Sequence, residues 1–95
     1  MTRRALFSMM PYSHADAIAR RFQIGGPRET IVMACSSGAA ALAVAADLVA
    51  CGDAPCALAG GVDAMTRICF MGFNALKLLD PEPCRPFDRE RRGMS

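Results

Sequence analysis

The sequence has no tryptophan, a single histidine and no two cysteines at C-x-x-C spacing. Its 95 residues carry a net charge of only +2 and no low-complexity tract. Because structural zinc sites need clustered cysteine and histidine ligands, we expect no metal site. Binding to nucleic acid or to an anionic membrane relies on a large excess of basic residues, so we expect neither.

Long hydrophobic runs are also missing. The N-terminal apolar stretch is broken at Ser8 and Pro11, which makes it too short for a signal peptide. The Ala-rich run Ala39–Ala50 contains Asp47 and falls well short of the roughly 20 apolar residues of a membrane span. We therefore expect a soluble, cytoplasmic protein, whose five cysteines are free thiols.

Apolar residues are plentiful, at 53% of the chain, which excludes disorder as the default interpretation. A chain of this length forms one small domain at most and buries about 60–65% of its unfolded surface. We therefore expect part of its apolar surface to face a partner subunit or a further part of the same domain.

A helix is predicted over 13–22. Ser13 can cap it, with Asp16 three residues later as the capping-box partner. Ile18 and Phe22 lie four residues apart on one face.

The next segments predict a βαβ unit. The β-branched run Glu29–Ala34 is typical of a buried strand. Ala39–Ala50 is apolar nearly all round, which predicts a helix inside a protein, with Gly52 as its C-terminal stop. Cys56–Ala64 predicts a second strand. This order indicates a βαβ crossover in a parallel sheet, and hence the α/β fold class.

The C-terminal third predicts a short helix and a long loop. Leu76, Leu78 and Leu79 suggest the helix, ended by Asp80 and Pro81. Three prolines predict an extended loop over 81–95, whose arginines alternate with acidic residues and are expected to be solvated or salt-bridged.

Cys35 holds a special place in this arrangement. It lies at the predicted carboxyl end of a strand, the sheet edge where ligands bind in open α/β folds. A helix N-terminus favours a thiolate, and the small Ser36, Ser37 and Gly38 leave room for a substrate. A sharp strand-to-helix turn also directs backbone N–H groups at a developing oxyanion. The alternative is a buried, inert thiol, which we expect for the other four cysteines.

Four motifs in order carry a family resemblance: "ACSSG", "AGGVDA", "GFNAL" and "CRPFDRERRGM". With them, nearly the whole chain from about Met10 onward resembles the β-ketoacyl-acyl carrier protein synthases, the condensing enzymes of fatty acid and polyketide synthesis. The resemblance implies part of a thiolase-like layered α/β fold, with residues 1–95 as a partial N-terminal domain.

The resemblance implies that Cys35 accepts an acyl group from an acyl carrier protein or acyl-CoA. A malonyl thioester then loses CO₂ and its carbanion attacks the bound acyl group. No metal or organic cofactor is implied, because the phosphopantetheine arm arrives with the carrier protein. The family forms homodimers in which the strand before the nucleophile, here Thr30–Ala34, pairs with its mate.

Other residues acquire expected roles from the resemblance. Phe70, Met71 and Phe73 are candidates for an acyl pocket, with core packing as the alternative. Asp88 and Arg89 are expected to support the site as a neighbouring or buried pair. Structural support near Cys35 is expected from four small residues: Ser36, Gly38, Gly60 and Gly61, the last two being either close-approach or ordinary turn glycines.

The family's two catalytic histidines have no counterpart in this sequence. His14 precedes the nucleophile and matches neither, so we interpret it as a helix-start or core residue. We expect the chain to be a fragment that lacks condensing activity on its own.

Two alternatives remain open. The chain can be a non-catalytic remnant that acts as an interaction or dimerisation module. It can also be a degradative thiolase or an unrelated hydrolase. The hydrolase G-x-S-x-G motif is missing, and "CRPFDRERRGM" favours the carrier-protein-dependent branch over a thiolase.

Overall fold

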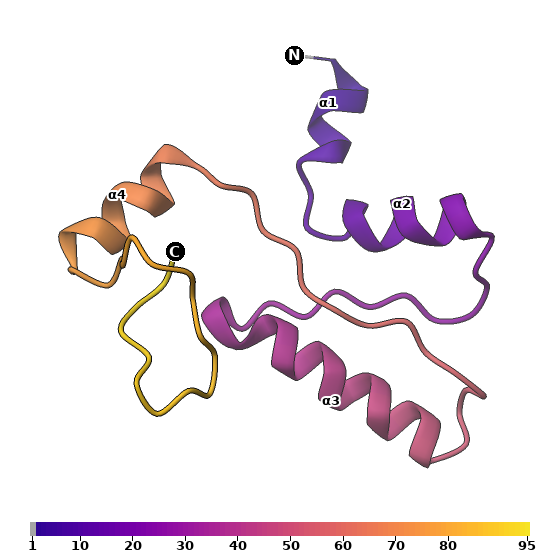
Figure 1. Cartoon of the computed structure of the whole chain (residues 1–95). Coiled ribbons are helices and arrows are strands. Elements are labelled where there is room, and N and C mark those ends of the chain that lie inside the picture. The colour runs from indigo at the N-terminus through magenta and orange to yellow at the C-terminus, as the bar shows by residue number, and fades with distance from the viewer. Residues whose placement is uncertain (1) are drawn as a thin grey trace. The chain divides into compact units, whose positions relative to one another are not determined.

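The computed structural model describes residues 2–95, apart from the side chain of Arg4. Within this range the chain forms four α-helices and one 3-10 turn (Figure 1). In order they are α1 (Arg3–Ser8), α2 (Ser13–Phe22), η1 (Ala34–Ser36), α3 (Ser37–Ala50) and α4 (Arg67–Ala75). The chain divides into two compact units, the first ending at Val62 and the second spanning Asp63–Ser95.

Helix α2 has the predicted bounds, but its predicted capping box is wrong. Tyr12 is the N-cap residue and makes no side-chain cap. The Ser13 hydroxyl instead donates to the Ser8 carbonyl at 3.0 Å. The Asp16 carboxylate accepts a hydrogen bond from Arg28 at 3.0 Å, which ties the segment after α2 back to the helix. Asp16 therefore forms ion pairs, with Arg28 and with Arg20 at 3.5 Å, rather than acting in a capping box.

Helix α3 confirms the predicted Ala-rich helix and begins two residues earlier, at Ser37. Gly52 follows its C-cap residue with φ +81°, and the Asp53 N–H bonds the Leu48 carbonyl at 2.9 Å. A left-handed glycine is the usual way to end a helix, so the predicted stop is confirmed.

The predicted strands Glu29–Ala34 and Cys56–Ala64 are not formed in the described part of the chain. Both run as open segments on either side of α3 in sequence, so the predicted βαβ unit is reduced to its helix (Figure 1). A strand exists only through hydrogen bonds to a neighbouring strand, and no described residue pairs with either segment. The error is one of missing partners rather than of local sequence preference.

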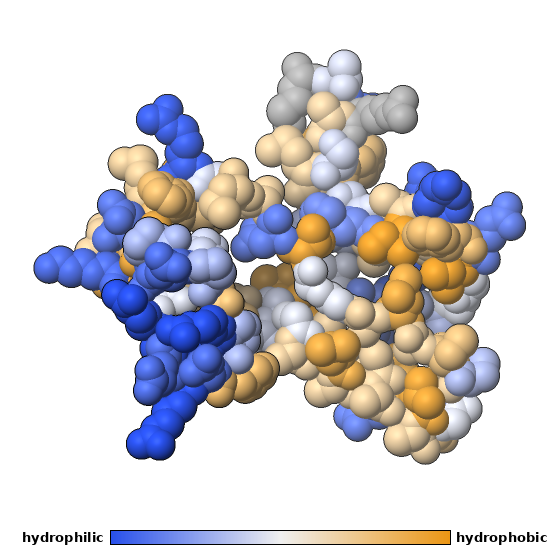
Figure 2. Space-filling model, viewed as in Figure 1, coloured by the Kyte–Doolittle hydropathy of each residue, from blue (hydrophilic) through white to orange (hydrophobic). Residues whose placement is uncertain are grey.

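Helix α3 is also not buried as predicted. Leu42 is 58% exposed and Val49 is 42% exposed, and Figure 2 shows apolar side chains gathered over the visible face of this helix. The segment Ala57–Ala59 lies along α3 and forms a shallow groove with it. Of the described residues, Ala19 is the one buried apolar residue, at 6% exposure. The first unit therefore presents apolar surface that its own residues do not cover.

The second unit begins with α4, which lies earlier than the predicted helix. The Thr66 hydroxyl caps it by accepting the Cys69 N–H at 3.2 Å. Lys77 takes a left-handed conformation at φ 56°, and the Leu78 N–H bonds the Phe73 carbonyl at 3.1 Å. The leucines that predicted a helix thus follow its end.

The predicted C-terminal loop is confirmed as irregular, and its two ends are clasped together. Leu79 and Met94 form an isolated parallel bridge. The Asp80 N–H donates to the Met94 carbonyl at 2.7 Å, and the Met94 N–H donates to the Leu78 carbonyl at 2.9 Å. Arg92 pairs with Asp80 at 3.4 Å, where the Asp80 side chain is only 12% exposed. The predicted salt-bridging of this arginine-rich loop is therefore confirmed.

Across residues 2–95, none of the helices combines the length and the apolar character needed to cross a membrane.

Gly93 is required by the clasp, and its substitution tests the fold of the second unit. A Cβ at Gly93 would lie 2.7 Å from the Leu78 carbonyl oxygen and 3.1 Å from Asp80 Cβ. We expect Gly93→Ala to lower the free energy of opening of the clasp by about 1–3 kcal/mol, as overpacking does. Hydrogen exchange of the Asp80 and Met94 amides, followed by NMR, should then be at least several-fold faster.

Gly72→Ala is the matched control, because a Cβ at Gly72 meets nothing within 4 Å. In mid-helix this change should stabilise α4 by about 0.5–1 kcal/mol and leave the clasp amides unaffected. Unchanged exchange of the Asp80 and Met94 amides in Gly93→Ala would contradict the close packing.

Candidate active site around Cys35

Cys35 is the middle residue of the η1 turn, two residues before the first residue of α3. The predicted helix follows it, whereas the segment that precedes it is irregular rather than a strand. Its thiol is exposed. A helix of this kind presents unpaired N–H groups and a partial positive charge at its N-terminus, so Cys35 is placed where an anion is favoured.

The turn that carries Cys35 has an unusual backbone. Ala34 has φ +49°, in the left-handed region that non-glycine residues rarely adopt. Such a conformation costs roughly 1–2 kcal/mol and persists only when surrounding interactions hold it. The strained residue thus lies directly before the candidate nucleophile.

The Ser37 hydroxyl supplies those interactions. It accepts the Met33 N–H at 2.8 Å and donates to the Ala34 carbonyl at 2.7 Å. The Ser37 backbone N–H also bonds the Ala34 carbonyl. From the sequence, Ser37 was expected only to be a small residue that leaves room for a substrate. Serine beside a helix start often bonds nearby backbone groups, and this is the signal that could have identified it.

Ser36 also turns its hydroxyl back toward the preceding chain. It donates to the Met33 carbonyl at 2.8 Å, an oxygen that already accepts the Ser36 backbone N–H at 3.1 Å. Although Ser36 is the N-cap residue of α3, its side chain makes no capping hydrogen bond. This hydroxyl therefore takes up none of the N–H groups of α3. The Ser37 N–H is already bonded to the Ala34 carbonyl, so an oxyanion formed at Cys35 would depend on the N–H groups that follow it.

Gly38 and Gly61 bring a distant segment against the start of α3. A Cβ added at Gly61 would lie 3.2 Å from Gly38 Cα, and one added at Gly38 would lie 3.8 Å from Gly61 Cα. A Cβ at Gly60 would meet nothing within 4 Å. Of the two alternatives for these glycines, Gly61 fits close approach and Gly60 fits an ordinary flexible position.

The second unit contains a cleft of about 550 Å³, within the size range of small-molecule sites. Phe70 and Phe73 of α4 line it, together with Met65, Leu79 and Met94. Asp63 and Asp80 add carboxylates to a mainly apolar wall.

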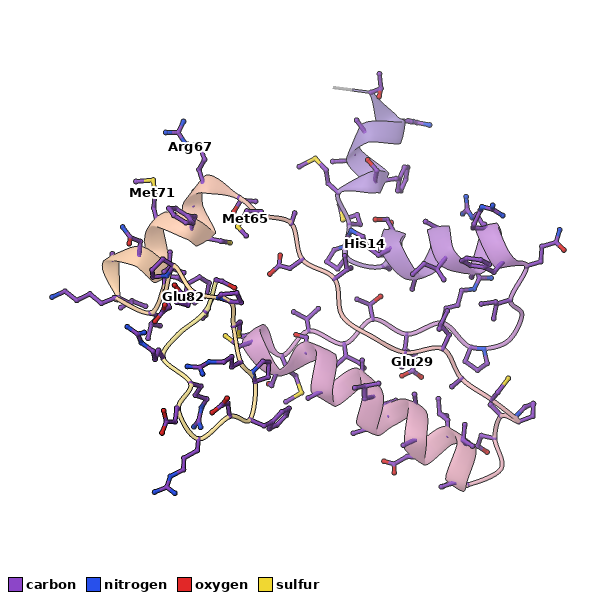
Figure 3. The ribbon with its side chains drawn as sticks, in the orientation of Figure 1. His14, Glu29, Met65, Arg67, Met71 and Glu82 are labelled. Carbon is purple, nitrogen blue, oxygen red and sulfur yellow. The ribbon has the colours of Figure 1, made fainter. Side chains whose placement is uncertain are left out.

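The third pocket candidate, Met71, lies outside this cleft. It is 63% exposed and is not among the lining residues. Figure 3 shows it pointing outward from α4, on the same side as Arg67. Met71 thus differs from Phe70 and Phe73, which face the cleft.

Asp88, expected with Arg89 to support the site, lies in a turn of the C-terminal loop. It accepts the Glu90 N–H at 2.7 Å and forms an ion pair with Arg85 at 3.8 Å. Both members of that ion pair are partly exposed, so Asp88 is not part of a buried pair in this structure. The supporting role of Asp88 and Arg89 near the site stays a prediction.

Exposure does not distinguish Cys35 from the other four cysteines or from His14. All five cysteines are unpaired and exposed, so the expectation of buried, structural thiols at Cys51, Cys56, Cys69 and Cys84 is wrong in this structure. His14 lies exposed in the first turn of α2, with Nδ1 3.2 Å from the Pro11 carbonyl oxygen, which supports its helix-start interpretation over a core one. What distinguishes Cys35 is its place before α3, not its exposure.

The adjacent glycines of the second open segment allow a matched test of the Gly38 contact. We expect Gly61→Ala to shift the backbone at the start of α3 and to destabilise that contact by about 1–3 kcal/mol, because its Cβ meets backbone. Gly60→Ala, with free space around it, should stay within about 0.5 kcal/mol. Amide chemical shifts and hydrogen exchange of Ser37 and Gly38 measure both, and an equal response to the two changes would argue against the contact.

Comparison with known proteins supplies the family. The model for "Beta-ketoacyl synthase, N-terminal domain" matches residues 2–95. Nodulation protein E of Rhizobium meliloti is 36% identical over 97 residues, covering 98% of this chain and 24% of that protein. The 3-oxoacyl-[acyl-carrier-protein] synthase 2 of the same organism is 39% identical over 87 residues, covering 83% of this chain and 21% of that protein. A highly reducing polyketide synthase of Gibberella zeae is 41% identical over 81 residues, covering 83% of this chain and 3% of that protein.

No solved structure matched the chain significantly. The chain spans about a fifth of the length of the first curated relatives it matches. The match over 2–95 agrees with the resemblance carried by the four motifs and sets aside the unrelated hydrolase. The chain belongs to the family of beta-ketoacyl synthase N-terminal domains.

Proposed function

We propose that this chain is the nucleophile-bearing part of a β-ketoacyl-acyl carrier protein synthase, with Cys35 as the acyl-accepting residue. The observation that carries the proposal is the family match over residues 2–95, together with the place of Cys35 of the "ACSSG" motif at the N-terminus of α3. Relatives named as 3-oxoacyl-[acyl-carrier-protein] synthase and polyketide synthase support the same reaction class.

The acyl transfer step needs a thiolate and an oxyanion site. The Cys35 sulfur attacks the carbonyl carbon of an acyl thioester, a new sulfur–carbon bond forms, and the carrier thiol leaves with the proton. The carbonyl oxygen becomes negative in between, and N–H groups at the start of α3 are suited to stabilise it. These groups all belong to the turn and helix around Cys35.

The condensation step needs further groups besides the thiolate and the oxyanion site. A malonyl thioester would lose CO₂, and its carbanion would attack the Cys35 thioester to release a β-ketoacyl product. The resemblance assigns decarboxylation to two histidines, whereas the one histidine of this chain is His14 on α2. Acylation is therefore the partial reaction that these 95 residues can support.

The proposal extends to pocket, partners and fold. Phe70 and Phe73 would hold an apolar acyl chain in the cleft of the second unit. The acyl carrier protein would deliver the substrates on its phosphopantetheine arm, so no further cofactor is required. In the whole protein, strands of a thiolase-like sheet would pair with the open segments Glu29–Ala34 and Cys56–Ala64, and a two-fold mate would pair with the former in a homodimer.

A second candidate function is an interaction or dimerisation module without catalysis. The exposed apolar residues of α3 favour it, because such surface needs a covering partner. This candidate requires no special reactivity at Cys35, and acylation therefore separates the two.

Acylation of the full chain by an acyl-CoA tests the nucleophile. We expect a single thioester adduct on Cys35, formed at least about tenfold faster than on any other thiol, because helix N-termini activate cysteines. Peptide mass mapping locates the adduct. Hydroxylamine cleaves thioesters and should therefore remove it.

Two cysteine variants serve as controls for this measurement. Cys35→Ala should abolish the adduct, and Cys51→Ala, at the opposite end of α3, should retain it. Uniform labelling of all five thiols would remove Cys35 from the mechanism and leave the interaction module as the better account.

Condensation should be absent from the 95-residue chain even when Cys35 is acylated. With acyl-loaded chain and malonyl-carrier protein, we expect no β-ketoacyl product and no CO₂ release above the level of Cys35→Ala, because no second general acid–base group accompanies the thiol. Mass spectrometry of the carrier-bound acyl group measures this. A β-ketoacyl product would contradict the division of labour proposed here.

A further inference from the structure

We propose that Ser37 is the positioning residue of Cys35: its hydroxyl fixes the turn that holds the thiol at the start of α3. This inference rests on the proposed function, since it concerns the residue that the proposal makes the nucleophile. It assigns to the second serine of the "ACSSG" motif a role distinct from that of the first.

One side chain holds both ends of the dipeptide before Cys35. The Ser37 hydroxyl accepts from the Met33 N–H at 2.8 Å and donates to the Ala34 carbonyl at 2.7 Å. The φ torsion angle of Ala34, +49°, lies along the backbone between these two bonded groups. Because Cys35 is the next residue, the torsion angles of Ala34 determine where the Cys35 backbone and its thiol lie relative to α3.

The neighbouring serine provides a contrast within the same turn. The Ser36 hydroxyl donates to the Met33 carbonyl, which also accepts the Ser36 backbone N–H. Removing that hydroxyl leaves the carbonyl bonded. Removing the Ser37 hydroxyl frees the Met33 N–H and takes one of two donors from the Ala34 carbonyl. The left-handed turn therefore depends on Ser37 much more than on Ser36.

Release of this turn has a direct consequence for the thiol. Alanine without such restraint prefers the ordinary helical and extended regions, so Ala34 would leave φ +49°. Cys35 would then move away from the N–H groups of α3. Its reactivity would then approach that of a thiol away from a helix N-terminus. Cys51, at the C-terminal end of α3, is the reference for such a thiol.

Two near-isosteric variants isolate the hydroxyl. Threonine keeps the hydroxyl of Ser37 and valine replaces it with a methyl group, so Ser37→Thr and Ser37→Val impose the same β-branched shape on the helix start. The full chain is treated with limiting iodoacetamide, and mass mapping gives the alkylation rate of each thiol. We expect Ser37→Val to slow Cys35 roughly fivefold to tenfold, the worth of about one net hydrogen bond, and Ser37→Thr to retain the rate.

Ser36→Ala is the control in the same turn and should leave the Cys35 rate unchanged. Cys51 and Cys84 should each keep the same alkylation rate in every variant, which shows that the chain is otherwise intact. Equal Cys35 rates in Ser37→Val and Ser37→Thr, with Cys35 still faster than Cys51, would overturn the positioning role and leave the proposed function standing.

A different outcome would count against the proposed function itself. If Cys35 reacts no faster than Cys51 in the unchanged chain, the nucleophile assignment fails. Hydrogen exchange of the Met33 amide then decides the role of Ser37 separately. Faster exchange in Ser37→Val than in Ser37→Thr supports the clamp on the turn, and equal exchange overturns it.

Discussion

A single hydroxyl, that of Ser37, holds the turn on which the position of Cys35 depends. The left-handed backbone of Ala34 costs roughly 1–2 kcal/mol, and two hydrogen bonds of about 1 kcal/mol each are of the size needed to offset it. All of these groups lie within five consecutive residues, Met33–Ser37. The turn is therefore local, and α3 extends it by supplying the helix N-terminus.

The rest of the chain contributes a backbone contact, an apolar cleft and an exposed apolar helix face. The Gly38–Gly61 contact fixes a segment distant in sequence against the start of α3. The second unit forms an apolar cleft with Phe70 and Phe73 in its wall. The exposed apolar residues of α3 leave surface that the described residues of the first unit do not cover. Cys35 and the cleft thus belong to different compact units.

Several features that depend on local sequence were predictable, although α4 with its Thr66 cap was not placed correctly, and features that depend on distant partners were not predictable. The bounds of α2, the existence of α3 and the stop at Gly52 follow from periodicity, alanine content and glycine's conformational freedom. The predicted strands are absent because a strand needs hydrogen bonds to a neighbouring strand. The capping box is absent because Tyr12, not Ser13, is the N-cap residue of α2, and the Ser13 hydroxyl bonds the Ser8 carbonyl.

In the candidate site, a local feature was also missed. The place of Cys35 before a helix could be predicted, whereas the role of Ser37 was missed because it accompanies a conformation of Ala34 that sequence favours only for glycine. The most direct test of this account is the conformation of Ala34 in solution. A strong intraresidue NOE between its amide and Hα protons, as positive φ produces, together with a Met33 amide protected from exchange, is the predicted result. A weak intraresidue NOE with rapid exchange at Met33 would show an ordinary backbone there and would contradict the account.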